Sequence, residues 1–98
     1  MSAGTFQVTR AAPDAVQVSG ALTFATAAQV LSAINAAAAE GCRQVDLAGV
    51  SQSDSAGLAC VLAALAQAVE SGRPLALRNV PEGMRVLASV CEVDQLLA

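Results

Sequence analysis

Apolar and polar residues alternate in two short stretches at the start of the chain. Polar residues separate Phe6 from Val8 and Val16 from Val18, and the intervening residues 11–14 include proline and aspartate, which favour turns. A period of two is typical of a strand with one buried side. The pattern therefore predicts an antiparallel β-hairpin.

After Gly20 the apolar residues follow the period of a helix. Thr23 or Thr26 is suited to cap the start of this helix, and Gly41 is suited to end it. The spacing predicts a helix over about residues 25–40. Its core-facing side would consist of Ala27, Val30, Leu31, Ile34 and Ala38.

A strand and a second helix are expected next. Val45 and Leu47 predict a short strand, which Val50 continues before a polar loop at residues 51–54. The helix is predicted over about residues 55–71, with Gly72 after its end. Its apolar stripe is the strongest in the sequence and indicates packing on the sheet. The stripe consists of Leu58, Val61, Leu62, Leu65 and Val69.

The last segment predicts a strand and a third helix. Leu75 and Leu77 form the strand, and Pro81 suits the first helical turn. The apolar face of the helix would carry Met84, Leu87, Ala88 and Cys91, and the end of the chain would be held to the core by Val93, Leu96 and Leu97.

The order β-β-α-β-α-β-α predicts an α/β fold. Strands joined through helices are expected to be parallel, with right-handed crossovers, beside the antiparallel hairpin. The result is a mixed four-stranded sheet packed with about three to four helices. No proline- or glycine-rich linker divides the chain, so residues 1–98 are expected to form a single domain.

The charged residues argue against a nucleic-acid partner. The net charge is −3, and all five cations are arginines, at scattered positions, with no lysine or histidine. Binding to phosphates requires clustered cations that displace counterions. The arginines are Arg10, Arg43, Arg73, Arg78 and Arg85.

The cysteines and the apolar runs indicate a cytoplasmic protein. Cys42, Cys60 and Cys91 are odd in number and far apart, which fits neither a disulfide framework nor a zinc site. No signal peptide opens the chain, and no apolar run is long enough to span a bilayer. We expect reduced thiols, and no metal or cofactor.

The composition also argues against catalysis. A serine nucleophile needs a base, usually histidine, and a phosphate-binding P-loop needs a lysine; the chain has neither residue. Asp46 and Asp54 are the remaining candidates for acid–base catalysis as a pair of carboxylates, but a structural role is expected for both. The sequence therefore predicts a binding module.

The polar segment before the second helix is the candidate site. It comes where a strand ends and a helix begins, and a helix N-terminus favours carboxylates and phosphoryl groups. Asp54 can cap this helix and leave the Ser55 hydroxyl free for a partner, or both residues can be capping residues only. Glycine in the first turn of a helix is less stable than alanine by up to ~1 kcal/mol. That cost is explained if another backbone approaches Gly57 closely, which favours the functional interpretation.

Residues 45–58, with the sequence Val-Asp-Leu-Ala-Gly-Val-Ser-Gln-Ser-Asp-Ser-Ala-Gly-Leu, resemble the signature of STAS domains. The resemblance extends to residues 19–23 and 77–81, which are similar to the family's first turn and last strand. It implies a STAS fold and a partner-binding or phosphorylation site. The site residues would be Gln52, Ser53, Asp54, Ser55, Ala56 and Gly57, with Thr23 at the rim.

Two branches of the STAS family remain open. The run after Asp54 resembles the MlaB-like branch, which implies docking on the ATPase of an ABC-type phospholipid transporter and only indirect contact with the inner membrane. The alternative is an anti-sigma factor antagonist, whose partner is a kinase that phosphorylates the position of Ser55. Ala21 and Thr23 stand where many relatives have acids, which argues against kinase docking and further favours the MlaB-like branch. Ala56, where relatives have serine or glycine, is another departure from the family pattern.

Overall fold

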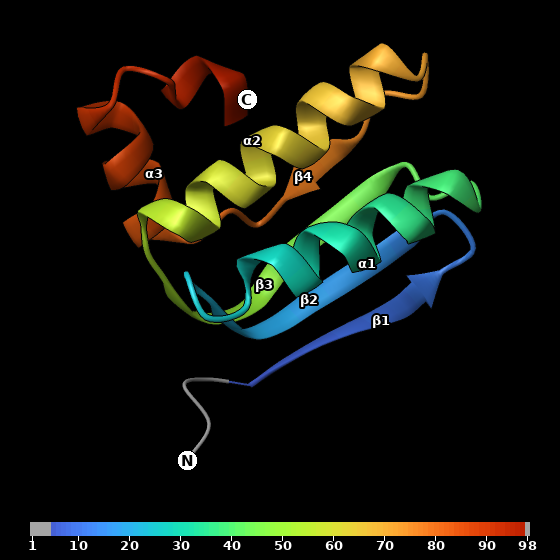
Figure 1. The fold of residues 1–98 in the computed structure, drawn as a ribbon, viewed down its shortest axis with the longest axis horizontal. Helices are drawn as coiled ribbons and strands as arrows, with labels where there is room; N and C mark the ends of the chain where they lie inside the picture. The colour runs from blue at the N-terminus through green and yellow to red at the C-terminus, as the bar shows by residue number, and fades with distance from the viewer. Residues whose placement is uncertain (1–4, 98) are drawn as a thin grey trace.

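The computed structural model describes residues 5–97 (Figure 1). The strands are β1 Phe6–Ala12, β2 Ala15–Leu22, β3 Gln44–Ser53 and β4 Ala76–Arg78. The helices are α1 Ala27–Ala39, α2 Ser55–Glu70, α3 Glu82–Val90 and the short 3-10 helix η1 Asp94–Leu97. The sheet has the order β1-β2-β3-β4, antiparallel between β1 and β2 and parallel elsewhere. The predicted α/β fold with a mixed four-stranded sheet is confirmed.

The opening hairpin turns more tightly than the sequence predicts. Ala12 pairs with Ala15, so only Pro13 and Asp14 lie in the turn. Arg10 stabilises this end, because its guanidinium donates to the Pro13 carbonyl at 2.8 Å and to Glu40 Oε1 at 2.8 Å. The pair with Glu40 is exposed and contributes little to stability.

The helices α1 and α2 run side by side across one face of the sheet (Figure 1). Alternate residues of the central strands are buried beneath them, as Val16 and Val18 are in β2. Gln17, between these valines, is only half-buried. The core is aliphatic, as the composition indicates. Its largest fully buried aliphatic side chains are Val18, Leu22, Val30, Ile34, Val45, Leu47, Val61 and Met84.

The first helix begins at Ala27 and not at residue 25. Thr26 holds the N-cap position, but its hydroxyl donates to the Ala21 carbonyl at 2.8 Å and leaves the helix uncapped. The end is as predicted: Gly41 has φ +110°, and the Cys42 N–H donates to the Ala37 carbonyl. This is the hydrogen-bond pattern of a glycine-terminated helix.

The predicted polar loop after the third strand is wrong. β3 continues to Ser53, and Gln52 and Ser53 pair with the last two residues of β2. One extra residue enters β3 between Asp46 and Gly49, and another between Val50 and Gln52. Such bulges change the direction of side chains along a strand. The apolar alternation is therefore lost although the backbone pairing continues.

The apolar stripe predicted for the second helix is only partly buried. Leu58 and Val61 are in the core, Leu62 and Leu65 are half-buried, and Val69 is 67% exposed. The inner side of α2 carries small residues instead. These are Gly57, Cys60, Ala64 and Ala68. Small side chains let α2 lie close to its neighbours, so the buried side is rotated away from the largest residues.

The C-terminal predictions are confirmed for Met84 and Ala88, which are buried. Pro81 holds the N-cap position of α3, without a side-chain hydrogen bond, and does not lie in the first turn. Cys91 holds the C-cap position after the last residue of α3 and is exposed, so it does not belong to the buried face of the helix. Leu97 is buried and Val93 is half-buried, but Leu96 is 54% exposed and does not hold the end to the core.

Candidate functional site

The candidate site lies where β3 passes into α2. The turn between β2 and α1 lies at the same end of the molecule (Figure 1). Residues 52–57 and Thr23, which the sequence analysis assigns to one surface, therefore come from two crossovers of the same sheet.

Asp54 joins these two segments. Its Oδ1 accepts a hydrogen bond from the Gly57 N–H at 3.0 Å, which confirms the predicted cap of α2. Its Oδ2 accepts from the Phe24 N–H at 3.0 Å, 30 residues away in sequence. The bond from Gly57 and then that from Phe24 lower the pKa of the Asp54 carboxyl. Both carboxylate oxygens are thus engaged in holding the fold.

Ser55 begins α2 beside this capping residue. Its side chain is exposed, as is that of Gln52, whereas Ser53 and Ala56 are half-buried. A hydroxyl at this place lies near the positive end of the helix dipole. The structure thus leaves Ser55 accessible to a partner or to a modifying enzyme.

Gly57 is required by a contact within the chain. A Cβ atom built on it would overlap the Leu22 carbonyl oxygen and lie 3.0 Å from the Leu22 carbonyl carbon and 3.1 Å from Leu22 Cγ. The close backbone that the sequence analysis expects at Gly57 is therefore the end of β2. Gly57 positions α2 against the sheet and is itself buried.

The turn before α1 adds a residue that the sequence analysis does not assign to the site. Thr23 is half-buried, but Phe24 exposes 85% of its surface. One feature of the sequence could have indicated this residue. Phe24 lies between Leu22, the last residue of β2, and Thr26, the N-cap residue of α1. The phenylalanine falls outside the apolar pattern of either element.

The carboxylates Asp46 and Asp54 have separate partners. Asp46 Oδ1 accepts from the Ala48 N–H at 2.8 Å and from Asn79 Nδ2 at 3.0 Å. The bond from Asn79, followed by that from Ala48, lowers the pKa of Asp46. Each carboxylate thus accepts one local hydrogen bond and one from a distant segment, which supports the structural role expected for both.

The three cysteines are free thiols in different surroundings. Cys42 and Cys60 are buried, and Cys91 is exposed. Burial raises the pKa of Cys60 to about 11, which keeps it protonated. Residues 5–97 contain no group of three histidine, cysteine or acidic side chains that could hold a metal ion. None of the helices described combines the length and apolar character needed to cross a membrane.

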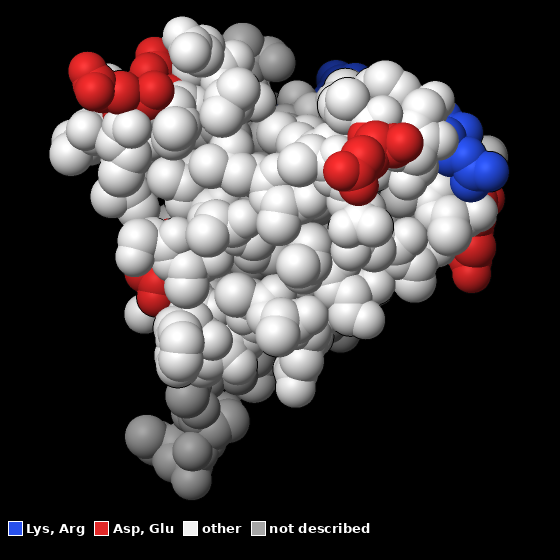
Figure 2. Space-filling model, turned by 45° about the horizontal axis from the view of Figure 1, so that its top comes forward, with Lys and Arg blue, Asp and Glu red and all other residues white. Residues whose placement is uncertain are grey.

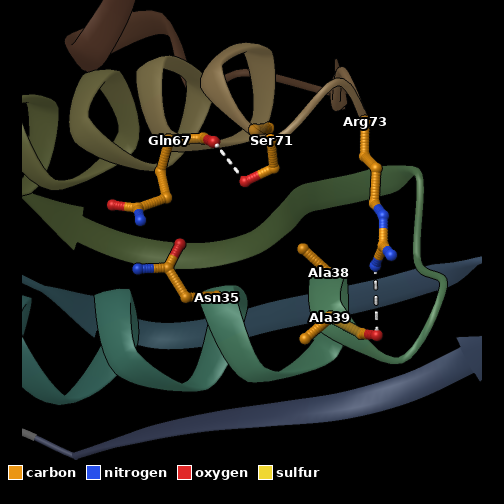
Figure 3. Close-up of a pocket in the computed structure, with 7 residues that line it drawn as sticks. Asn35, Ala38, Ala39, Gln67, Ser71 and Arg73 are labelled. Atoms are coloured by element: carbon orange, nitrogen blue, oxygen red, sulfur yellow. Dashed lines mark hydrogen bonds between the residues drawn. The ribbon is translucent and has the colours of Figure 1, made fainter.

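Two clefts on the helical side of the molecule are lined by residues outside the candidate site. An open cleft of about 350 Å³ separates the C-terminal halves of α1 and α2, where Asn35 and Gln67 face each other (Figure 3). Arg73 closes the end of this cleft and donates to the Ala39 carbonyl at 3.3 Å. A second, apolar groove of about 420 Å³ lies between α2 and Leu96. The candidate site is therefore a surface formed by two segments, which suits contact with another protein.

Comparison with known proteins first defines the fold class. The fold is similar to that of the anti-sigma factor antagonist SpoIIAA in its unphosphorylated form, with a TM-score of 0.69 and 18% identity. The similarity covers 94% of this chain and 84% of that one. No curated protein matches the sequence.

The family follows from the sequence match. Residues 6–98 match the family described as Mlab, STAS domain, and the chain belongs to this family. STAS domains bind other proteins and in general are not enzymes. The fold and the family therefore define a regulatory or binding protein.

Proposed function

We propose that this chain is a non-enzymatic subunit that docks on the ATPase of an ABC-type phospholipid transporter. It would act in the cytoplasm and would be held at the inner membrane only through its complex with the transporter. The match of residues 6–98 to the Mlab, STAS domain family supports this branch. The observation that carries the docking site is the exposed Ser55 beside Asp54, whose carboxylate is already engaged in the fold.

The chemistry of this surface suits a permanent contact. Ser55 and Gln52 offer neutral hydrogen-bonding groups, and the charged carboxylate of Asp54 between them already accepts hydrogen bonds from two backbone N–H groups. A partner can therefore approach without burying an unpaired charge, which would oppose binding. Ala56 would lie within the contact and Thr23 at its rim.

A second function is favoured by the accessibility of Ser55. As an anti-sigma factor antagonist, the protein would bind a kinase that phosphorylates this hydroxyl, and about two added negative charges would then break the complex. The likeness to SpoIIAA supports this alternative at the level of the fold.

Binding of Ser55→Glu to the purified transporter ATPase of the same organism tests the docking site. We expect the fold to be retained, because negative charge suits a helix N-terminus. Binding should weaken by ~1 to 3 kcal/mol in calorimetric titration, as for an interface hot spot. Ser89→Glu, an exposed serine of α3, is the matched control and should bind as wild type. Unchanged affinity of Ser55→Glu would refute the site.

The phosphorylation state of the native protein separates the two functions. Mass spectrometry of protein purified during growth and under stress should find an ATPase at constant ratio and no phosphate on Ser55. A substantial phosphorylated fraction that has lost its partner would instead establish the antagonist function.

A further inference from the structure

Phe24 is the most exposed of the large apolar residues in the described chain, at 85%. The sequence has only two aromatic residues, and the other, Phe6, packs against the core. An aromatic ring provides more apolar contact area than any aliphatic side chain. Here that area is presented to solvent at the end of the molecule that carries the candidate site.

The turn that carries Phe24 is held on both sides. The buried Thr26 hydroxyl donates to the Ala21 carbonyl at 2.8 Å and accepts from the Thr23 N–H at 3.1 Å. The Thr23 carbonyl accepts from the N–H groups of Thr26 and Ala27, at 3.0 and 2.8 Å. The backbone under Phe24 is therefore ordered before any partner binds, which reduces the entropy lost on association.

Asp54 connects Phe24 to the docking site. Its carboxylate holds the Phe24 N–H at 3.0 Å, and the next residue along the chain is Ser55. A partner that covers Ser55 therefore meets Phe24 within the same contact. Aromatic anchors surrounded by small or polar residues are the usual hot spots of protein interfaces.

We propose that Phe24 is the anchor of the docking surface and inserts into an apolar pocket of the partner protein. This inference rests on the proposed function and adds the chemistry of the partner: an apolar pocket beside groups that hydrogen-bond to Ser55. It also assigns separate tasks to the two segments. Ser55 gives polar specificity, and Phe24 gives most of the affinity.

The charges near Phe24 favour a protein partner over a lipid surface. The sequence has no cation between Arg10 and Arg43, or between Arg43 and Arg73, and so none near Phe24 or Ser55 in sequence. Surface helices that bind lipid carry lysine or arginine for the anionic headgroups. In Figure 2, acidic side chains occupy separate spots, with uncharged surface between them. A surface with one exposed aromatic side chain and no cation nearby in sequence suits an apolar pocket in a protein better than an anionic lipid surface.

Titration of the purified transporter ATPase with substituted proteins tests the anchor. Phe24→Ala should weaken binding by about 30-fold or more, as for a hot spot, and Phe24→Leu should weaken it less. Val90→Ala removes a 75% exposed apolar side chain from α3 and should bind as wild type. All three variants should melt as wild type, because neither side chain supports the core. Wild-type affinity of Phe24→Ala would overturn the anchor while leaving the docking function intact, whereas failure of the wild type to bind would overturn both.

Fluorine NMR gives a second, direct measurement. Protein labelled with 4-fluorophenylalanine should give two resonances, and Phe24→Leu identifies the one from Phe24. Addition of the ATPase should shift or broaden the Phe24 resonance and leave that of Phe6 nearly unchanged. An unchanged Phe24 resonance in the complex would overturn the proposal. Broadening by phospholipid vesicles without the ATPase would also overturn it and would identify Phe24 as a lipid contact.

Discussion

Replacing Gly57 by alanine tests how the docking surface is built. Gly57 lies in the first turn of α2, where alanine is intrinsically the better helix former by up to ~1 kcal/mol. The added Cβ would overlap the Leu22 carbonyl oxygen and lie 3.0 Å from its carbon. Leu22 cannot move freely, because it ends β2 and pairs with Ser53 of β3.

The two effects oppose each other, and the steric one is larger. Overpacking of a closely fitted contact costs roughly 1–3 kcal/mol, and the upper end applies here because the obstructing atoms are backbone. After subtraction of the helix preference, Gly57→Ala should lower the free energy of unfolding by about 2 kcal/mol. For a chain of this size the melting temperature would fall by about 10 °C.

Gly83→Ala is the matched control. Gly83 also lies in the first turn of a helix, but a Cβ atom there would meet no atom within 4 Å. This substitution should leave stability unchanged or raise it by up to ~1 kcal/mol. Urea unfolding followed by circular dichroism measures both, since the chain contains no tryptophan. If Gly57→Ala were as stable as Gly83→Ala, the close packing of α2 on Leu22 would be refuted.

Two further outcomes concern titratable groups. Hydrogen bonds from Gly57 and Phe24 lower the pKa of Asp54, so its stabilising effect is present above the unfolded pKa of about 3.9 and is lost as the pH falls through the folded pKa. Asp54→Asn should therefore be less stable than wild type by ~1 kcal/mol at pH 7, and this difference should shrink below pH 4 in urea titrations. A difference that does not depend on pH would contradict the role of the two hydrogen bonds to the carboxylate. Cys91 should react with a thiol reagent at pH 8 while Cys60, whose pKa is raised to about 11 by burial, stays unmodified until the protein unfolds. Rapid labelling of Cys60 in intact-protein mass spectra would show that α2 opens readily.

The sequence predicts those elements whose large apolar residues repeat with a clear period. The hairpin, the end of α1 at Gly41 and the start of α2 at Ser55 are all confirmed. The end of β3 is missed because its last residues are polar and two bulges break the alternation, while backbone pairing with β2 continues. Pairing between backbones does not depend on which side chains are present, so the apolar pattern cannot predict where it ends.

The same limit explains what is missed in α2 and at the site. Small residues such as Ala64 and Ala68 face the core and give a weak apolar signal, whereas the larger Val69 faces solvent. The cap by Asp54 is local and could be predicted. Its bond to Phe24 joins residues far apart in sequence, and only the folded chain brings them together.

The bond from Asp54 to residue 24 uses the main-chain N–H and not the side chain. Every amino acid except proline supplies that N–H, so the turn would keep its shape with almost any residue at position 24. Asp54 and Gly57, in contrast, are held to one choice by the hydrogen bonds and the close packing around them. During evolution, a change at position 24 alone could therefore adapt this surface to a new partner with little effect on the stability of the fold.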